Sequence, residues 1–573
     1  MKETKHFSIL YPQYEDAEYK QLSGVACHDL GLDTLCRELS GDAKEQNLIM
    51  GIISNMTSDP RVALYRQKVF ADILALPEMR KQLSELFEKI ESIRNFKRAH
   101  IDSDEKLGFW HLMHRLDELY DYIRCVEALR ECLSNSEIKS EGLLNLKKHI
   151  DDLYEDSCFE EMKKDISELK EKSSDIQSVT LGINVNERFE AVSMGLVSVN
   201  NKPFKKSNIV SNFADAITSK NKLHDGTEWN GDMHYHQIDK LHSGKISSVI
   251  ESVGGYTALQ SAPAMGENIR ATVANTPDGD GTANSTFYLD NVLNKMLASL
   301  VKLLRDTLTK YANIAVVDIS HVIPEFMYYI RFAEFIERNT KKGFKFCEAR
   351  LSENDDVSMD SRDIYNLKLA VTLNSPDELV YNDLKFDREH TVYILTGANR
   401  GGKTTITQAV GLMFALAQGG IFVPATSFEY KPVDCIYTHF PADEDKTMDL
   451  GRLGEECVRF KAIFSDSTKD SLLLLNETFS TTSFEEGFYI AKDSVRALLK
   501  KQVRTIYNTH MHKLAADVDE MNTDENAAKA SSLIMKSDSG KRSFKVEIAS
   551  PEGWSYAKDI AEKYGVTYEM LIN

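Results

Sequence analysis

At 573 residues the chain is too long for one hydrophobic core, and its length predicts roughly two to four domains. Apolar residues make up 42% and charged residues 27% of the chain, which is typical of a soluble globular protein. The formal net charge of −19 counts against a large DNA-binding surface, because neutralising phosphates takes a basic face. It does not exclude a local basic cluster, since net charge says nothing about where charges gather.

Nothing in the sequence predicts secretion or a membrane span. The N-terminal segment has no apolar stretch of the kind that a secretory signal needs, and no apolar run elsewhere is long enough to cross a bilayer. The eight cysteines are scattered and include no CxxC pair, which favours reduced thiols over a disulfide framework or a zinc site. We therefore expect a cytoplasmic protein without membrane association.

The first predicted domain, residues 1–177, is helical. Between about Leu22 and Glu171 apolar residues recur at three- and four-residue steps with charges between them, which is the pattern of amphipathic helices. The clearest stripe is made of Leu107, Trp110, Leu112, Leu116, Leu119, Ile123, Val126 and Leu129. Glycine and proline, which interrupt helices, are scarce in this stretch.

An insertion is expected at residues 178–284. Its first part, up to Val199, alternates apolar and polar residues around a turn signal, which predicts a β-hairpin. Residues 200–284 are rich in Asn, Gly, Ser and Asp and predict an exposed, irregular segment. A long helix and further helical segments should follow over residues 285–375. From residue 376 to the end, strand and helix signals alternate as in an α/β domain.

The strongest motif is the glycine-rich segment at residues 397–404. An apolar run ending at Leu395 leads into GANRGGKT and a helical pattern follows, so the GxxxxGK[ST] pattern stands in the strand–loop–helix setting that it needs. Glycines let backbone N–H groups close around phosphates, and the N-terminus of the helix adds a favourable partial charge. Lys403 can reach the β- and γ-phosphates, and the Thr404 hydroxyl can ligate Mg²⁺. The predicted phosphate-binding residues are Gly397, Ala398, Asn399, Arg400, Gly401, Gly402, Lys403, Thr404 and Thr405.

A second strand should end in a carboxylate that activates water. Four consecutive leucines at residues 472–475 suit a strand buried on both faces, and Asn476 and Glu477 follow directly. At the carboxyl end of that strand Glu477 can orient or deprotonate an attacking water. A third short strand, TIYNT, is followed by His510, whose imidazole can hydrogen-bond the γ-phosphate or the water. We predict catalytic roles for Lys403, Glu477 and His510.

In these elements the chain resembles the MutS family of DNA mismatch-repair ATPases. The matching motifs are GANRGGKTT with the family's GPNMGGKST, GGIFVPA with its GxxVPA, NETFSTTS with its DExGRGTS, and NTH with its ATH. Near the end, the stretch from Ser555 to Val566 resembles the closing pattern of the family's dimerising helical tail. The likeness covers the chain from Leu379 onward, and a weaker likeness to the family's helical core includes residues 57–74.

The resemblance implies an α/β P-loop ATPase domain of the ABC type at residues 376–573, preceded by a mainly α-helical core and lever domain with a clamp-like insertion. It also implies a homodimer whose nucleotide sites lie between facing subunits. In the family a loop before the acidic strand crosses to the partner's nucleotide; here Gly451 and Arg452 take that place without the family's serine, and an ordinary loop is the alternative. The resemblance also implies that Val380 and Tyr381 lie beside the adenine. The alternative, that these residues form a plain β-turn, fits the sequence nearly as well.

Two departures from the family pattern change these expectations. Asn476 stands where the family has aspartate. Thr404 and, through water, Asn476 are the predicted Mg²⁺ ligands, but an amide brings no charge, so Mg²⁺ affinity and turnover should be low. In addition, core-like helices start almost at the N-terminus, so we expect a divergent member that lacks the N-terminal mismatch-recognition domain.

These observations predict an ATPase, with ATP and Mg²⁺ as cofactors, that senses or clamps mismatched or branched DNA in repair or recombination. ATP binding and hydrolysis at a composite dimer interface would drive it. The alternative is an ATP-switched protein-interaction module that binds no DNA, which the negative charge favours. A small-molecule kinase that uses the same loop is a third interpretation, but no acceptor-site motif supports it.

Overall fold

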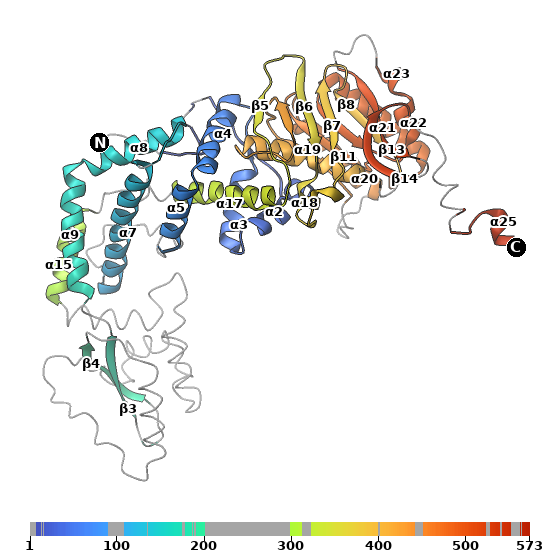
Figure 1. The fold of residues 1–573 in the computed structure, drawn as a ribbon. Helices are drawn as coiled ribbons and strands as arrows, with labels where there is room; N and C mark the ends of the chain where they lie inside the picture. The colour runs from blue at the N-terminus through green and yellow to red at the C-terminus, as the bar shows by residue number, and fades with distance from the viewer. Residues whose placement is uncertain are drawn as a thin grey trace. The chain divides into compact units, whose positions relative to one another are not determined.

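The computed structural model describes residues 7–12, 14, 16–89, 108–134, 136–174, 178–185, 187, 191–200, 298–311, 322–398, 401–441, 451–522, 528–538, 541–551, 562 and 564–572 (Figure 1). The chain divides into two compact units. The first contains residues 1–85, 132–148 and 321–573, and the second contains residues 86–131 and 149–320. The irregular segment expected after residue 200, and the loop residues Asn399 and Arg400, lie outside the described residues.

A six-stranded sheet forms the centre of the C-terminal part of the first unit. Its strands, in spatial order, are β10 (Ile436–His439), β11 (Leu472–Asn476), β12 (Arg504–Asn508), β8 (Val392–Thr396), β13 (Ala530–Asp538) and β14 (Lys541–Ile548). The first five run parallel, and β14 is antiparallel to β13. Every residue of β8, β11 and β12 is buried, which is why the leucine run of β11 shows no alternation.

Helices cover both faces of this sheet, with α19 on one side and α21 and α22 on the other (Figure 1). The helices of the second group are α20 (Arg452–Asp466), α21 (Phe484–Lys501), α22 (His512–Ala516) and α23 (Val518–Met521). On the opposite face α19 (Lys403–Gln418) begins directly after the glycine-rich loop. A Cβ at Gly411 would lie 2.7 Å from Leu474 of β11 and 2.3 Å from Leu30, so glycine is what allows α19 to pack this closely.

The first unit also contains a four-stranded sheet. Its strands, in order, are β5 (Ala349–Leu351), β9 (Ser427–Tyr430), β6 (Val357–Ile364) and β7 (Asn382–Asp387), and α18 (Leu367–Ala370) and η1 (Pro376–Glu378) lie between β6 and β7. β5 runs parallel to β9, and the other two pairings are antiparallel. Asn382 joins this sheet to the larger one, because its side chain donates to the carbonyl of Phe544 at 3.1 Å and accepts from the N–H of Val546 at 2.8 Å.

The N-terminal residues and α17 form the helical part of the first unit. Its elements are β1 (Lys20–Gln21), α1 (Gly24–Leu30), α2 (Leu32–Leu39), α3 (Ala43–Ile53), β2 (Asn55–Met56), α4 (Pro60–Ala75) and α17 (Val322–Lys341). The aromatic residues that α17 buries are Phe326, Tyr328, Tyr329, Phe332 and Phe335. Local signals set where α4 begins: Asp59 accepts from the N–H of Arg61, and Pro60 occupies the first turn, where its missing N–H costs nothing.

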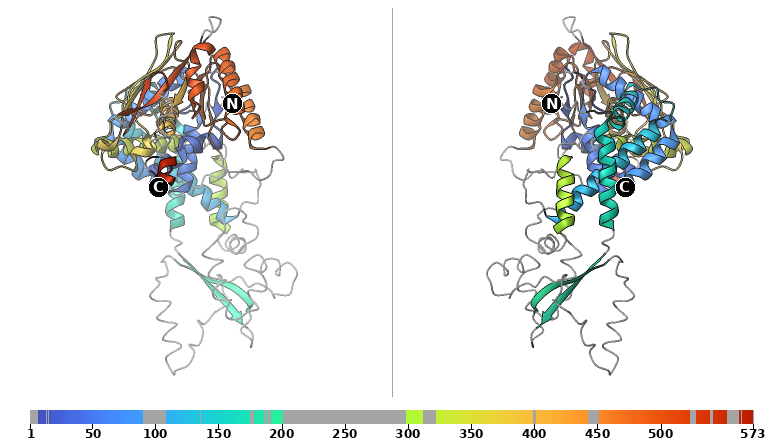
Figure 2. Two further views of the ribbon diagram at one scale, coloured as in Figure 1. Left: turned by 90° about the vertical axis from the view of Figure 1, so that its right-hand side faces the viewer. Right: turned by 90° about the vertical axis from the view of Figure 1, so that its left-hand side faces the viewer.

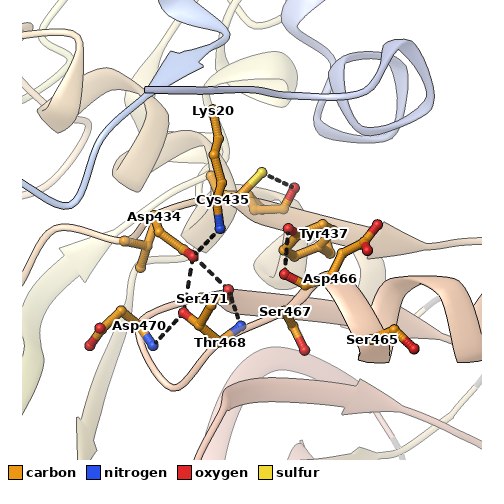
Figure 3. Close-up of polar contacts among 12 residues, drawn as sticks. Lys20, Asp434, Cys435, Tyr437, Ser465, Asp466, Ser467, Thr468, Asp470 and Ser471 are labelled. Atoms are coloured by element: carbon orange, nitrogen blue, oxygen red, sulfur yellow. Dashed lines mark hydrogen bonds and ion pairs between the residues drawn. The ribbon is translucent and has the colours of Figure 1, made fainter. Parts of the chain in front are cut away.

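A polar cluster around Asp434 joins the amino ends of β10 and β11 (Figure 3). Lys20 approaches from β1 and donates to Oδ2 of Asp434 at 2.6 Å. From the turn before β11, Thr468 and Ser471 donate to the same carboxylate at 2.9 and 2.5 Å. Burial raises the pKa of Asp434, but these hydrogen bonds outweigh it and leave the pKa below its ordinary value. The cluster lies at the amino edge of the sheet, and we assign it to stability.

Long helices and a hairpin make up the second unit. Its helices are α9 (Ser157–Ser174), α15 (Ala298–Lys310) and most of α7 (Phe109–Ser134), while α5 (Pro77–Lys89) and α8 (Glu141–Tyr154) have residues in both units. The predicted stripe of α7 is buried at Leu116, Leu119, Val126 and Leu129. β3 (Ser178–Val185) and β4 (Ala191–Asn200) pair antiparallel where alternation predicts a hairpin, and they form a twisted ribbon (Figure 2). Within the described ranges no helix is long and apolar enough to span a membrane.

Candidate nucleotide-binding site

A cavity of about 470 Å³ opens at the carboxyl ends of β8, β11 and β12. From the side of the large sheet and α19 it is lined by Gly401, Gly402, Lys403, Thr404, Thr405, Ile406, Asn476, Glu477 and His510. The opposite wall of the cavity is lined by residues that include Tyr365, Asn366, Leu379 and Val380, and by Phe544 of β14, the edge strand of the same sheet. In α/β proteins ligands bind at this edge of the sheet, because strand ends and helix N-termini meet there.

Backbone geometry shows why the loop before α19 needs glycine. Gly397 and Gly402 have φ angles of 145° and 96°, a region that residues with a Cβ rarely adopt. A Cβ at Gly397 would lie 2.7 Å from Cβ of Met535, and one at Gly401 would lie 2.8 Å from the carbonyl oxygen of Ala398. Gly402 is the N-cap of α19, so the loop brings the free N–H groups of the helix N-terminus to the cavity.

Lys403 is the first residue of α19, and its side chain is only 6% exposed. Its ammonium group folds back over the loop, where it donates to the carbonyl of Gly397 at 3.1 Å and lies 3.9 Å from Oε1 of Glu477. Burial lowers the pKa of Lys403, and the carboxylate of Glu477 acts in the opposite direction. A cation beside the N–H groups of a glycine loop and a helix N-terminus is an arrangement suited to phosphate.

A chain of side-chain hydrogen bonds runs along this edge of the sheet. The hydroxyl of Thr404 donates to Oδ1 of Asn476 at 3.2 Å, and Nδ2 of Asn508 donates to the same oxygen at 3.1 Å. The hydroxyl of Thr407 lies 2.9 Å from Oδ1 of Asn508 and 3.0 Å from the carbonyl oxygen of Lys403, so the chain of contacts extends to the first turn of α19.

Two uncharged oxygens, from Thr404 and Asn476, therefore meet at one point beside the loop. Oxygen ligands of this kind fit Mg²⁺, which keeps several waters and is usually bound through one or two protein groups and the phosphates of its substrate. No cluster of three His, Cys, Asp or Glu suited to a metal occurs among the described residues. The donor set thus fits a magnesium ion that arrives with a nucleotide better than a metal held by the protein alone.

Glu477 follows β11 directly and has a φ of 54°, which is uncommon for a residue with a side chain. Its N–H donates to the carbonyl of Asn508 at 2.9 Å, and its Oε1 lies 3.0 Å from Nε2 of His510. The side chains of Glu477 and His510 are 20% and 44% exposed, so water can reach both. The ammonium group of Lys403 and the imidazole of His510 therefore both lie close to the carboxylate of Glu477. The three side chains predicted to be catalytic are thus brought together.

The opposite wall contains residues that sequence reasoning did not single out. Tyr365 and Phe544 line it together with Val380, which the family resemblance predicts to lie beside the adenine. Tyr381 is not among the lining residues, and its ring packs edge-on against Tyr365 with the centroids 5.8 Å apart. Asn366 lines the same wall and donates to a carbonyl in the first turn of α19 at 2.8 Å, so it connects this wall to the phosphate side of the cavity.

Gly451 and Arg452 lie apart from this cavity. Gly451 is the N-cap of α20 and Arg452 is the first residue of that helix, and neither lines the pocket of its own chain. The contact of these residues with the nucleotide of a second chain stays a prediction, with an ordinary loop as its alternative.

The parallel sheet, the glycine-rich loop and the cavity at the carboxyl edge define an α/β nucleotide-binding domain. Residues 393–570 match the family description MutS domain V, and residues 58–225 match the description MutS2 N-terminal domain. The chain belongs to the MutS family, and the C-terminal match identifies the family's ATPase domain in it.

Similar proteins carry the same family name. The DNA mismatch repair protein MutS of Prochlorococcus marinus (strain MIT 9301) is 35% identical over 164 residues, which are 28% of this chain and 18% of that protein. The protein of the same name from Chlorobium phaeobacteroides is 36% identical over 150 residues, 25% of this chain and 16% of the relative. That of Chlorobaculum tepidum is 33% identical over 173 residues, 30% of this chain and 20% of the relative. The matched part thus spans a fifth or less of the length of these relatives.

Proposed function

We propose that the chain is a Mg²⁺-dependent ATPase in which the loop before Lys403 binds the phosphates of ATP and Glu477 activates the attacking water. The observation that carries this proposal is the position of the Glu477 carboxylate, 3.0 Å from His510 and 3.9 Å from Lys403 at the carboxyl edge of the sheet. Hydrolysis of ATP needs a base, a cation that binds phosphate, and a polar side chain that can orient the water.

Hydrolysis would begin with attack of water on the γ-phosphorus. Glu477 takes a proton from the water while the water oxygen forms a bond to the γ-phosphorus. The bond from the γ-phosphorus to the β,γ-bridging oxygen breaks, which releases ADP and phosphate. Lys403 and the N–H groups at the start of α19 hold the negative charge of the phosphates, while His510 orients the carboxylate and the water. Thr404 and, through water, Asn476 would hold Mg²⁺, whose role is to neutralise charge on the β- and γ-phosphates.

For the adenine we propose the wall that contains Val380. The cavity of about 470 Å³ has the size of pockets that hold small ligands. Tyr365 and Phe544 add aromatic surface next to Val380, and Tyr381 supports Tyr365 from behind. Apolar and aromatic side chains suit a flat base, while the charged groups at the other end of the cavity suit phosphates.

A second copy of the chain would complete the site. Gly451 and Arg452 can reach the partner's γ-phosphate through backbone N–H groups and a guanidinium group. The helix α25 (Tyr568–Ile572), near the C-terminus, leaves Leu571 66% and Ile572 63% exposed, which supports a contact surface there. Sedimentation of the protein with and without a non-hydrolysable ATP analogue tests this point. A protein that stays monomeric with every nucleotide contradicts it.

The ATPase assignment is tested by comparing Glu477→Gln with the wild type and with Glu353→Gln, a control at an exposed position outside the cavity. We expect slow hydrolysis by the wild type and the control, no measurable steady-state hydrolysis by Glu477→Gln, whose residual rate is measured only in single turnover with the protein in excess, and binding of an ATP analogue by all three. Equal hydrolysis by the wild type and Glu477→Gln would remove Glu477 as the base. Failure of the wild type to bind the analogue would remove the nucleotide site itself.

We further propose that ATP controls the binding of mismatched or branched DNA in repair or recombination. Membership of the MutS family supports this, as does the name of the relatives, DNA mismatch repair protein MutS. The rival is an ATP-switched protein-interaction module without DNA binding, which the net charge of −19 favours. Binding to duplex, mismatched and four-way DNA over a range of salt, with and without ATP, separates the two, because phosphate contacts weaken as salt rises. No binding to any of the three at low salt favours the rival.

A further inference from the structure

The segment after β11, made of Glu477, Thr478 and Phe479, contains two residues with an uncommon backbone. Glu477 has a φ of 54° and Phe479 a φ of 63°, so two residues with side chains lie in the left-handed region that normally suits glycine. Such a conformation persists only where the surrounding contacts fix it, and it is often found at functional sites. The contacts of this segment are therefore part of how the carboxylate of Glu477 is held.

Thr478 anchors the segment. It is 1% exposed and does not line the cavity. Its Oγ1 lies 3.1 Å from Nδ1 of His439, the last residue of β10, and its carbonyl accepts from the hydroxyl of Tyr507, in β12, at 2.9 Å. β10 and β12 are the two neighbours of β11 in the sheet. Thr478 therefore contacts a residue of the neighbouring strand on each side of β11.

His439 can make this contact without bringing a buried charge. It is 3% exposed, and burial together with the nearby Arg459 lowers its pKa to about 4. The imidazole is therefore neutral at pH 7. A neutral ring and a hydroxyl can share one hydrogen bond in a buried position without the desolvation cost of an ion.

Packing by two helices completes the support. The ring of Phe479 packs edge-on against Phe460 of α20, with the centroids 5.4 Å apart. A Cβ at Gly487 would lie 2.4 Å from the carbonyl oxygen of Phe479, so α21 packs directly against the same segment. A shift of the backbone after Glu477 would therefore disturb its contacts with β10, β12, α20 and α21.

We propose that Thr478 and His439 are positioning residues for ATP hydrolysis: their contact fixes the backbone after Glu477 and so directs its carboxylate at the attacking water. Neither residue touches the nucleotide in this scheme. The proposal rests on the proposed function. It predicts that loss of the contact slows the chemical step and leaves nucleotide binding in place, because binding depends on the glycine-rich loop and Lys403.

The test compares Thr478→Val, which removes the hydroxyl but keeps the shape, with Thr478→Ser, which restores the hydroxyl. Thr505→Val is the matched control: Thr505 is equally buried, stands near the amino end of β12 in the same sheet, and donates to the carbonyl of Val503 at 2.9 Å. We expect Thr478→Val to lower kcat about tenfold and to change KM and the Kd of a non-hydrolysable ATP analogue by less than about twofold. Thr478→Ser and Thr505→Val should keep at least about half of the wild-type kcat.

The same substitution in a Glu477→Gln background separates positioning from a general loss of structure. If Thr478 acts through Glu477, single-turnover hydrolysis with the protein in excess is no slower in the double variant than in Glu477→Gln alone. Tyr507→Phe removes the hydroxyl on the other side of the segment without changing its shape, and it should lower kcat in the same direction. If Thr478→Val lowers the melting temperature of the protein, the kcat of Tyr507→Phe is used in place of the kcat of Thr478→Val to test the proposal.

Wild-type kcat in Thr478→Val overturns the proposal, and where Thr478→Val lowers the melting temperature, wild-type kcat in Tyr507→Phe overturns it. A further loss of rate in the Glu477→Gln background also overturns it, as does a loss of analogue binding as large as the loss of kcat. If Glu477→Gln hydrolyses ATP as fast as the wild type, the proposed function itself fails. If Glu477→Gln is inactive and Thr478→Val is fully active, only the positioning role is wrong.

Discussion

Oε1 of Glu477 lies 3.0 Å from Nε2 of His510. The two residues follow neighbouring parallel strands, β11 and β12, whose carboxyl ends meet at the same edge of the sheet, so their proximity is a consequence of the topology. The ammonium group of Lys403 lies 3.9 Å from the same carboxylate. The carboxylate therefore lies between the imidazole of His510 and the ammonium group of Lys403.

Replacing His510 with asparagine should slow ATP hydrolysis and leave ATP binding nearly unchanged. The substitution removes the ring that we propose orients the Glu477 carboxylate, and we expect kcat to fall about 10- to 100-fold. Steady-state kinetics and a separate titration with an ATP analogue measure the two effects. His28→Asn is the control, because the side chain of His28 is 78% exposed and outside the cavity. A loss of analogue binding as large as the loss of kcat would contradict a role confined to hydrolysis.

Asn476→Asp should raise the affinity of the site for Mg²⁺. Oδ1 of Asn476 already accepts hydrogen bonds from Thr404 and Asn508, so a carboxylate can keep both and add a negative charge. We expect the Mg²⁺ concentration that gives half-maximal hydrolysis to fall roughly three- to tenfold, which corresponds to about 1 kcal/mol. A magnesium titration of ATPase activity measures this, with Asn354→Asp, at an exposed position, as the control. An unchanged titration would mean that residue 476 is not part of a magnesium site.

The sequence predicts those parts of the site whose residues lie close together along the chain, in short continuous segments. The leucine run of β11 is buried at every position, as a strand inside a parallel sheet must be. Glu477 and His510 each follow such a strand, so their position at one sheet edge can be inferred without knowing any long-range contact. The positive φ angles at Gly397 and Gly402 fall where the spacing of the motif puts glycine.

The opposite wall of the cavity could not be predicted, because tertiary packing assembles it. Tyr365 and Phe544 come from distant parts of the chain, and no local pattern marks either as a ligand contact. Phe544 reaches the cavity because Asn382 holds the backbone of β14 through two hydrogen bonds. Similarly, β5 and β6 precede residue 376 but pair in one sheet with β7 and β9, which follow it, and helix and strand signals alone do not reveal that pairing.

Asp434→Asn should destabilise the protein at neutral pH, and the effect should fade in acid. Burial raises the pKa of Asp434, but hydrogen bonds from Lys20, Ser471 and Thr468 outweigh it and lower the pKa in the folded protein. Such a carboxylate contributes stability above its unfolded pKa of about 4 and loses it as the pH falls through the folded value. We expect a loss of about 1–3 kcal/mol at pH 7.

Unfolding of the wild type and Asp434→Asn between neutral pH and acid checks this prediction. The control is Asp355→Asn, because the side chain of Asp355 is 99% exposed and its ion pair with Lys431 contributes little. A difference in stability that stays the same as the pH falls below about 4 would show that the cluster acts through shape and not through charge.

Phe479 and Gln502 have φ angles of 63° and 59°, yet glycine should have opposite effects at the two positions. Glycine removes the steric cost of the left-handed conformation, about 1–2 kcal/mol, but adds up to about 1 kcal/mol of conformational entropy to the unfolded chain. Gln502 is exposed and is the C-cap residue of α21. Gln502→Gly therefore loses little packing and should stabilise the protein by about 0.5–1 kcal/mol.

Phe479→Gly gains the same backbone relief but loses a ring that is 1% exposed and packed against Phe460. Deleting a buried phenylalanine side chain costs about 3–5 kcal/mol, so the loss of packing outweighs the relief and the variant should be about 2–4 kcal/mol less stable. The family pattern DExGRGTS has glycine at this place, and here an aromatic ring supplies packing where the family pattern supplies conformational freedom. Calorimetry of both variants decides the point: a Phe479→Gly protein that melts above the wild type would show that backbone strain, and not packing, dominates at residue 479.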